Sequence, residues 1–166
     1  SNVPAIDFTI DAETRLGQGT EGVKYRDNIA AIRLLKQIES EGRRASPDEQ
    51  RVLARYVGWG GLKNAFQVAG ARDEAGIAKG WEKQVAELKE LLTPQEYRSA
   101  RNSTTAAHYT SETVVKAVWK MAERMGFNGG AVLEPSMGTG NFLGLMPPAL
   151  RGKTATVGVE YDGLTA

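Results

Sequence analysis

Apolar residues recur at helical spacing through much of the first hundred residues. Between residues 25 and 42 an apolar residue returns at every third position, which marks the buried face of an amphipathic helix. The members of this stripe are Ile29, Ile32, Leu35 and Ile38. Residues 81 to 92 predict another helix, whose apolar face holds Trp81, Val85, Leu88 and Leu91. The first 20 residues lack such a pattern and predict an extended arm anchored by Phe8 and Ile10.

Two short motifs mark the starts of further helices. Residues 46–49 (SPDE) and 93–96 (TPQE) each place a hydroxyl side chain at the N-cap, a proline at the first helical position and a glutamate three residues after the cap. This arrangement is a capping box. The first of these helices is expected to end at Gly58 and to carry Val52, Leu53, Tyr56 and Val57. Residues 1–105 are therefore predicted to be mostly helical.

A fifth helix is predicted from about residue 111 to 125. Thr110 or Ser111 caps it, and its apolar residues recur on one face. That expected buried face consists of Val114, Val115, Val118, Trp119 and Met125. The opposite face carries a basic residue at every fourth position, namely Lys116, Lys120 and Arg124. This stripe fits either contact with DNA phosphates or an ordinary solvated face, and the near-neutral charge of the chain favours the second.

The pattern then changes from helix to strand. The apolar run Val132-Leu133 ends in Glu134 and leads into a turn that contains Gly138 and Gly140. Such a pattern is typical of a buried strand whose C-terminal end meets a ligand, because glycines let a ligand approach the backbone and allow positive φ before a helix that begins near Asn141. The turn lacks the Lys-Ser/Thr of a P-loop and the third glycine of a dinucleotide fingerprint, which disfavours nucleoside triphosphates.

A second acid follows at the end of a second predicted strand. Residues 155–159 form an apolar run that ends in Glu160, 20 positions after Gly140. In doubly wound sheets the acid that closes the second strand binds ribose hydroxyls and lies about 20 residues beyond the glycine turn. Two strands that end in acids, Glu134 and Glu160, suit a ligand with both an amino-acid head and a ribose.

These segments resemble a known family. Residues 134–142 (EPSMGTGNF) resemble motif I of S-adenosylmethionine-dependent DNA methyltransferases that modify the adenine amino group, and residues 158–162 (GVEYD) resemble motif II. Residues 108–115 (HYTSETVV) look like motif X, and the order X, I, II matches the circularly ordered members. Residues 56–62 and 100–105 further resemble the N-terminal part of large methyltransferase-helicase proteins of phages and conjugative elements.

The resemblance implies S-adenosylmethionine as cofactor. Glu134 would receive the methionyl ammonium, Glu160 would bind the ribose, and Tyr161 would pack on the adenine ring. The implied cofactor-binding residues are Tyr109, Thr110, Glu134, Pro135, Ser136, Gly138, Thr139, Gly140, Asn141, Phe142, Glu160 and Tyr161. The implied fold is α/β: a helical N-terminal region, 1–105, followed at 106–166 by the first, incomplete part of a Rossmann-like methyltransferase sheet.

The motif that receives the target base is missing from this chain. Adenine methyltransferases carry Asn/Asp/Ser-Pro-Pro followed by an aromatic residue that stacks on the flipped base. The only Pro-Pro pair here, Pro147-Pro148, follows Met146 and precedes Ala149. We therefore expect the catalytic residues to lie outside this chain, and we interpret the chain as a piece of a larger protein that transfers a methyl group to DNA without a metal.

Composition narrows the remaining possibilities. The chain has no cysteine and a single histidine, His108, which excludes a disulfide framework and a Cys- or His-rich metal site. His108 fits a structural hydrogen-bonding role better than catalysis. No apolar run approaches the ~18 residues that span a membrane, and no signal sequence is visible, so a cytoplasmic location is expected. The net charge of +1 gives no overall attraction to nucleic acid, so any DNA contact would involve local patches or the parent protein.

Three alternative classes stay open. A methyltransferase that acts on RNA or protein can share motifs I and II. A non-catalytic interaction module is the second class, in which the helical region docks a helicase or packaging partner, for instance a helicase domain of the same parent chain in a restriction-modification or anti-restriction system. The third is a degenerate dinucleotide-binding domain, which the incomplete glycine pattern disfavours.

Overall fold

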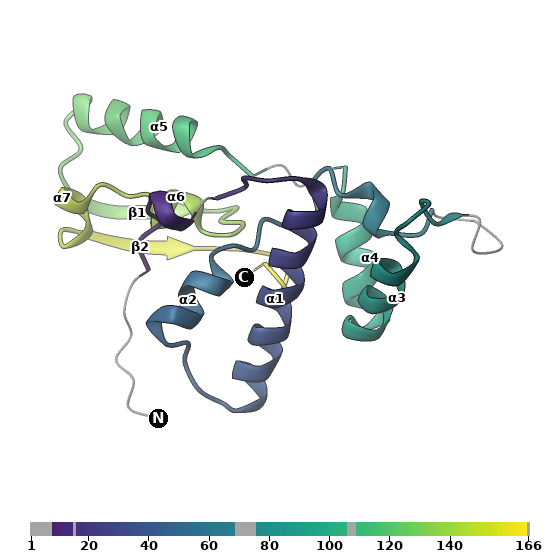
Figure 1. The fold of residues 1–166 in the computed structure, drawn as a ribbon. Coiled ribbons are helices and arrows are strands. Elements are labelled where there is room, and N and C mark those ends of the chain that lie inside the picture. The colour runs from purple at the N-terminus through teal and green to yellow at the C-terminus, as the bar shows by residue number, and fades with distance from the viewer. Residues whose placement is uncertain (1–7, 15, 69–75, 106–108, 166) are drawn as a thin grey trace.

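The computed structural model describes residues 8–14, 16–68, 76–105 and 109–165 (Figure 1). These ranges fold as a mixture of helices and a small parallel sheet. The helices and strands are α1 (Glu21–Ser40), α2 (Pro47–Leu53), α3 (Glu82–Leu91), α4 (Pro94–Ser103), α5 (Glu112–Arg124), β1 (Gly130–Glu134), α6 (Asn141–Gly144), α7 (Pro148–Arg151) and β2 (Thr154–Gly158), with 3₁₀ turns η1 (Ala12–Thr14) and η2 (Lys63–Ala65). The coarse prediction of an α/β chain with a helical N-terminal region is confirmed.

The long helix α1 starts one turn earlier than the apolar stripe indicates. Thr20 is its N-cap, and the Thr20 hydroxyl accepts a hydrogen bond from the Val23 N–H. A capping hydroxyl satisfies one of the unpaired donors in the first turn, so the helix begins at Glu21 although its buried residues start at Tyr25. The predicted stripe is confirmed, since Ile29, Ile32 and Ile38 are buried, with Leu35 half-buried.

Both capping boxes are confirmed, but the first helix that they open is shorter than predicted. α2 ends at Leu53, so the expectation that it runs to Val57 was wrong. The cause is a side chain of α1: Asn28 accepts a hydrogen bond from the Val57 N–H at 2.9 Å and donates one to the Gly58 carbonyl at 2.7 Å. The Val57 N–H and the Gly58 carbonyl are therefore bonded to a buried amide and not to a continued helix.

Aromatic rings fill the core of the helical region. Trp59 is 1% exposed and makes edge-on contacts with Tyr25, Tyr56 and Phe66 at centroid distances of 5.2–6.5 Å. Such edge-to-face pairs are favoured over face-to-face stacking. Trp59 therefore packs in the core and is not exposed for stacking on a base.

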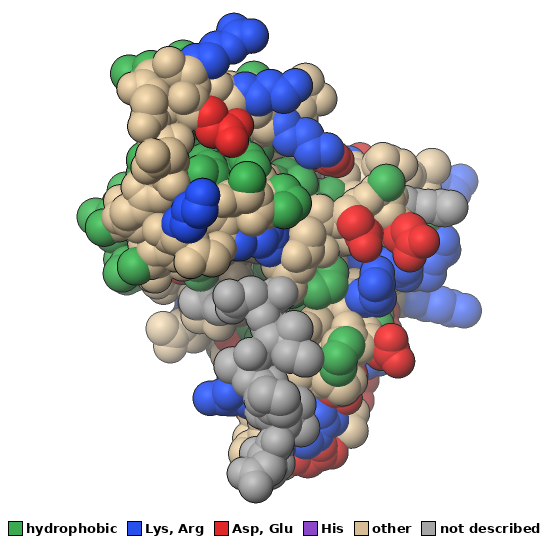
Figure 2. Space-filling model, turned by 90° about the vertical axis from the view of Figure 1, so that its left-hand side faces the viewer, with side chains coloured by type: hydrophobic (Ala, Val, Ile, Leu, Met, Phe, Trp, Pro, Cys, Tyr) green, Lys and Arg blue, Asp and Glu red, His purple; other side chains and the backbone are tan. Residues whose placement is uncertain are grey.

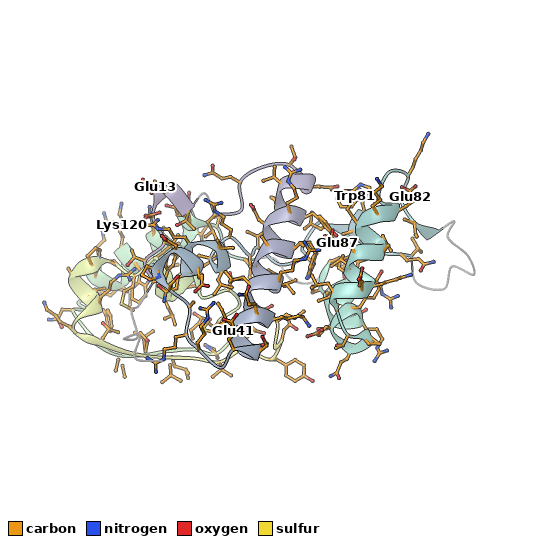
Figure 3. All side chains as sticks on the ribbon, turned by 60° about the horizontal axis from the view of Figure 1, so that its bottom comes forward. Glu13, Glu41, Trp81, Glu82, Glu87 and Lys120 are labelled. Atoms are coloured by element: carbon orange, nitrogen blue, oxygen red, sulfur yellow. The ribbon has the colours of Figure 1, made fainter. Side chains whose placement is uncertain are left out.

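Glu87 of helix α3 forms hydrogen bonds with two residues of α1. Figure 3 shows Glu87 of α3 on the side that faces α1. Its carboxylate accepts hydrogen bonds from the Tyr25 hydroxyl at 2.7 Å and from the Arg33 guanidinium at 2.8 Å. Burial, followed by the neighbouring Glu87, raises the pKa of Tyr25 above the usual range of tyrosine, so Tyr25 stays a neutral donor.

The parallel sheet pairs β1 with β2 in register from Gly130 opposite Thr154 to Glu134 opposite Gly158. A second hydrophobic core lies between this sheet and the helices α5, α6 and α7. Its buried members are Val115, Trp119, Leu145, Met146 and Leu150, and the half-buried Ile10, Leu16, Phe127, Val132 and Phe142 pack against them. The arm prediction is thus confirmed at Ile10, whose N–H also donates to the Gly144 carbonyl at 2.9 Å.

The expected burial of α5 and of the two strands was partly wrong. Val115 and Trp119 are buried, but Val114, Val118 and Met125 are 50%, 37% and 81% exposed. The outer face of the sheet is also open, as its exposed apolar side chains Leu133, Val157 and Val159 show. Among the described residues, only one face of the sheet and one side of α5 pack against other hydrophobic side chains. Hydrophobic side chains accordingly reach the surface at the sheet end of the molecule (Figure 2).

Candidate functional site

The turn after β1 has the backbone geometry expected of a ligand-binding glycine turn. Gly138 has φ +55° and Gly140 has φ +76°, and Gly140 is the N-cap of α6. A side chain in this left-handed region costs about 1–2 kcal/mol. The prediction of positive φ in this turn is therefore confirmed, and it holds at both glycines.

The sheet pairing extends into this turn and fixes its place. Val159 N–H donates to the Glu134 carbonyl at 2.9 Å, and Met137 N–H donates to the Val159 carbonyl at 2.8 Å. The Met137 side chain lies against Gly158, where a Cβ would overlap the Met137 sulfur. Met137 therefore packs on the end of the sheet. The matching requirement for a glycine at 158 was missed, since its cause is a contact between residues that are distant in sequence.

Glu160 connects the end of β2 to the glycine turn. Its Oε2 accepts a hydrogen bond from the Gly138 N–H at 2.7 Å, and its Oε1 accepts from the N–H groups of Tyr161 at 2.8 Å and Asp162 at 2.9 Å. The backbone N–H of Asp162, and after it those of Gly138 and Tyr161, hold the pKa of Glu160 below its usual range against the opposing effect of burial. Glu160 is therefore an ionised acceptor at neutral pH.

The other predicted acid lies at the same edge of the sheet. Glu134 is the last residue of β1 and is paired in register with Gly158, two residues before Glu160. Its side chain is half-buried, and within the described ranges it has neither a hydrogen-bond nor an ion-pair partner. Pro135 and Ser136 follow it as exposed turn residues. Both predicted acids thus lie at the carboxyl ends of parallel strands, where open α/β sheets bind ligands.

Tyr109 lies directly against the glycine turn. A Cβ at Gly138 would come within 2.7 Å of Tyr109 Cε1, so the ring occupies the space that a side chain at this position would need. The Tyr109 hydroxyl is 3.4 Å from the Thr165 hydroxyl. Burial is the main cause that raises the pKa of Tyr109 above its usual range, so the phenol is neutral.

Hydrogen bonds join the segment before α5 to the segment after the turn. Asn141 is 7% exposed, and its Nδ2 donates to the Thr110 carbonyl while its Oδ1 accepts from the Thr139 hydroxyl at 3.0 Å. The carbonyl of Phe142 accepts from Trp119 Nε1 at 2.9 Å. The structure therefore brings the predicted residues 109–110 and 138–142 together. His108 lies outside the described residues.

Tyr161 is separate from these contacts. Its side chain is fully exposed and lines a cavity of about 580 Å³ between α1, α4 and residues 161–164. Its neighbour Asp162 accepts a hydrogen bond from the Ser99 hydroxyl of α4 at 3.3 Å. The predicted contact between Tyr161 and a cofactor ring stays a prediction.

A cavity of about 300 Å³ adjoins the predicted residues. The segment before α5 and the glycine turn provide one wall, which consists of Tyr109, Thr110, Ser111, Glu112, Thr139 and Asn141. The opposite wall belongs to the helical region and its preceding arm and consists of Leu16, Gly17, Lys24, Val57 and Gly60. Sequence reasoning missed this second wall. The glycine-rich segment 58–61 was the only signal, and its first residue, Gly58, was interpreted as the end of a helix.

The described residues form neither a cluster of metal-ligating side chains nor a membrane-spanning helix. In the described part of the chain, no three His, Cys, Asp or Glu side chains are grouped so that they could hold a metal ion. Among the helices of the same residues, none combines the length and the apolar character that crossing a bilayer requires.

Comparison with protein-family models, with curated proteins and with solved structures found no match to this chain. Its function is therefore inferred from its own residues and their geometry.

Proposed function

We propose that residues 106–166 bind S-adenosylmethionine as the first part of a Rossmann-like DNA methyltransferase that modifies the adenine amino group. The observation that carries this proposal is the 2.7 Å hydrogen bond between Glu160 and the Gly138 N–H. It places the acid of the second strand on the glycine turn of the first. That pairing of turn and acid, at the carboxyl edge of parallel strands, is the arrangement that binds a nucleoside-bearing ligand.

The chemistry of the edge matches the two ends of this cofactor. The Glu134 carboxylate is half-buried and has no partner in the described ranges, so it is available to an ammonium group. Glu160 offers ionised oxygens to the ribose hydroxyls. A Cβ at Gly140 would meet no atom within 4 Å, so this glycine lets the ligand approach the backbone. In the parent protein the methyl group would pass from the sulfonium to the adenine amino group by in-line displacement, and residues outside this chain would accept the hydrogen bonds of the target amino group.

Ribose binding requires an exchange of hydrogen bonds at Glu160. A carboxylate has about four acceptor positions, and three of them already hold backbone N–H groups. A bidentate contact with two ribose hydroxyls therefore displaces one of these donors. Gly138 N–H is the donor that belongs to the other strand, so its release accompanies ligand binding in this proposal.

In this proposal the parent protein acts in the cytoplasm. Contact with DNA and with a helicase partner is then a property of that parent protein. Lys116, Lys120 and Arg124 are exposed on α5, as the sequence predicted. Lys116 is paired with Glu112 at 2.5 Å, which leaves the two later residues as the freer cations of this stripe. Two exposed cations are a small contribution to phosphate binding.

The proposal is tested by ligand selectivity. Isothermal titration of the 166-residue chain with S-adenosylhomocysteine, S-adenosylmethionine, ATP and NAD is expected to give saturable binding of the first two alone. The reason is that the turn has no phosphate-binding lysine and places a carboxylate where a phosphate would lie. Preferential binding of NAD would favour the dinucleotide class. Failure of all four ligands to bind a folded chain would contradict the proposal and leave the interaction module as the better interpretation.

A further inference from the structure

The ring of Tyr109 is held between two glycines that are 80 positions apart in the sequence. A Cβ at Gly58 would lie 2.7 Å from the Tyr109 Oη and 2.9 Å from Cζ, and it would be nearest to Cε2. A Cβ at Gly138 would lie 2.7 Å from Cε1 and 2.9 Å from Cδ1. The two glycines therefore contact opposite edges of one ring, and neither position has room for a side chain while the ring stays in place.

The Gly58 side of this contact is rigid. Asn28 is fully buried and bonds both the Val57 N–H and the Gly58 carbonyl. Three residues later, the Gly61 N–H donates to the carbonyl of Thr104 at 3.1 Å. Trp59, between these two anchors, is 1% exposed. Because this segment is fixed on both sides, it determines where the Tyr109 ring can lie.

We propose that the helical region positions Tyr109 over the glycine turn, with Gly58 as the contact and Asn28 as the residue that fixes Gly58. Tyr109 is then a positioning residue for the ligand at Gly138, and the helical region is part of the ligand site. This inference rests on the proposed function, because the ligand in question is S-adenosylmethionine. A side chain at residue 58 would collide with the ring and displace it from its place against Gly138, which would alter the turn that the ligand contacts.

A glycine with the same backbone strain provides the matched control. Gly61 lies in the same segment with φ +78°, close to the φ of +65° at Gly58, but a Cβ at Gly61 would meet no atom within 4 Å. Gly58→Ala and Gly61→Ala therefore share the cost of a left-handed alanine, and only the first also collides with Tyr109. Any difference in stability or affinity between the two variants is therefore due to the collision with the Tyr109 ring.

The contact itself is tested by thermal unfolding without ligand. We expect Gly58→Ala to lower Tm by at least about 3 °C more than Gly61→Ala. In a Tyr109→Ala background the two glycine variants are expected to lower Tm equally. If Gly58→Ala alone does not fold, recovery of a folded chain in Gly58→Ala/Tyr109→Ala shows the same coupling. Equal losses for both glycine variants in the wild-type background would overturn the contact.

The positioning role is tested by titration of the folded variants with S-adenosylhomocysteine. Gly58→Ala is expected to weaken binding at least tenfold relative to Gly61→Ala, about 1.4 kcal/mol. The titration is repeated in the Tyr109→Ala pair, which should show no such difference. A merely structural contact would change Tm and leave affinity unchanged, and that result overturns the positioning role. Absence of binding by the wild-type chain instead overturns the proposed function and this role with it, while the unfolding experiment still decides the contact.

Discussion

Glu160 is the residue on which the site depends, because three backbone N–H groups from both sides of the sheet edge converge on its carboxylate. These donors lower its pKa relative to the unfolded chain. A depressed pKa means that the stabilisation by Glu160 is fully present above the ordinary pKa of glutamate and is lost as the pH falls through the lower, folded value. At neutral pH the carboxylate is thus both a structural acceptor and the group proposed for the ribose.

Replacement of Glu160 tests the proposed contact with the ribose. Glu160→Ala is expected to weaken S-adenosylhomocysteine binding by about 1.5–3 kcal/mol, the range for hydrogen bonds to charged groups. Glu123→Ala, which removes an exposed carboxylate of α5, is the control and is expected to bind normally. Calorimetric titration of both variants measures the effect. Unchanged affinity in a folded Glu160→Ala chain would remove the ribose role.

Sequence reasoning worked best for residues with a strong local signal. The positive φ values of Gly138 and Gly140 and the position of Glu160 beside them follow from the spacing of a glycine turn and a strand-end acid. The glycine requirements at 58 and 158 could not be predicted, since they arise from the side chains of Tyr109 and Met137 in other segments. A contact between distant residues leaves no periodic pattern in one sequence.

At the scale of elements, the starts of helices were easier to predict than their ends and their buried faces. The capping boxes at Ser46 and Thr93 are local and were identified correctly. The end of α2 depends on Asn28 of another helix. On α5 two adjacent apolar ridges have the same helical spacing, and the sequence does not say which one packs. The structure buries Val115 and Trp119 and leaves Val114 half-exposed.

Two neighbouring valines of α5 test this assignment. Val115→Ala is expected to lower the free energy of unfolding by about 1.5–3 kcal/mol, because Val115 is 0% exposed in the second core. Val114→Ala makes the same chemical change at a position that is 50% exposed, and its effect is expected to stay within about 0.5 kcal/mol. Urea unfolding of the two variants measures both values. Equal effects would show that α5 is rotated relative to the sheet.

At the scale of the whole molecule, each of the two hydrophobic cores includes a residue that is distant from it in the sequence. Ile10 of the arm packs with the core beneath the sheet, and Leu164 packs on the core of the helical region. α1 lies between the sheet and the α3–α4 pair (Figure 1). The division of the chain at residues 105 and 106 stays a prediction. The glycine turn lies where the two parts meet, which explains why both supply walls of its cavity.

The chain by itself is expected to transfer no methyl group. It lacks the Asn/Asp/Ser-Pro-Pro-aromatic sequence that accepts the target amino group and stacks on the flipped base. Incubation with radiolabelled S-adenosylmethionine and mixed-sequence DNA should therefore give no incorporation above a blank without protein. Robust incorporation would show that residues of this chain do the catalytic work and would contradict their assignment to a segment outside it.

The central claim is that the glycine turn and Glu160 together form the ligand site. An NMR titration of the ¹⁵N-labelled chain with S-adenosylhomocysteine tests it at residue resolution. Saturable shifts are expected at the amides of Gly138, Gly140, Tyr161 and Asp162, with the largest at Gly138, whose N–H loses its bond to Glu160 when the ribose binds. The amides of Gly42 and Gly80, which lie in turns of the helical region, should stay unshifted. A folded chain whose Gly138 amide does not respond at ligand concentrations above about 1 mM, or whose shifts cluster elsewhere, would contradict the claim.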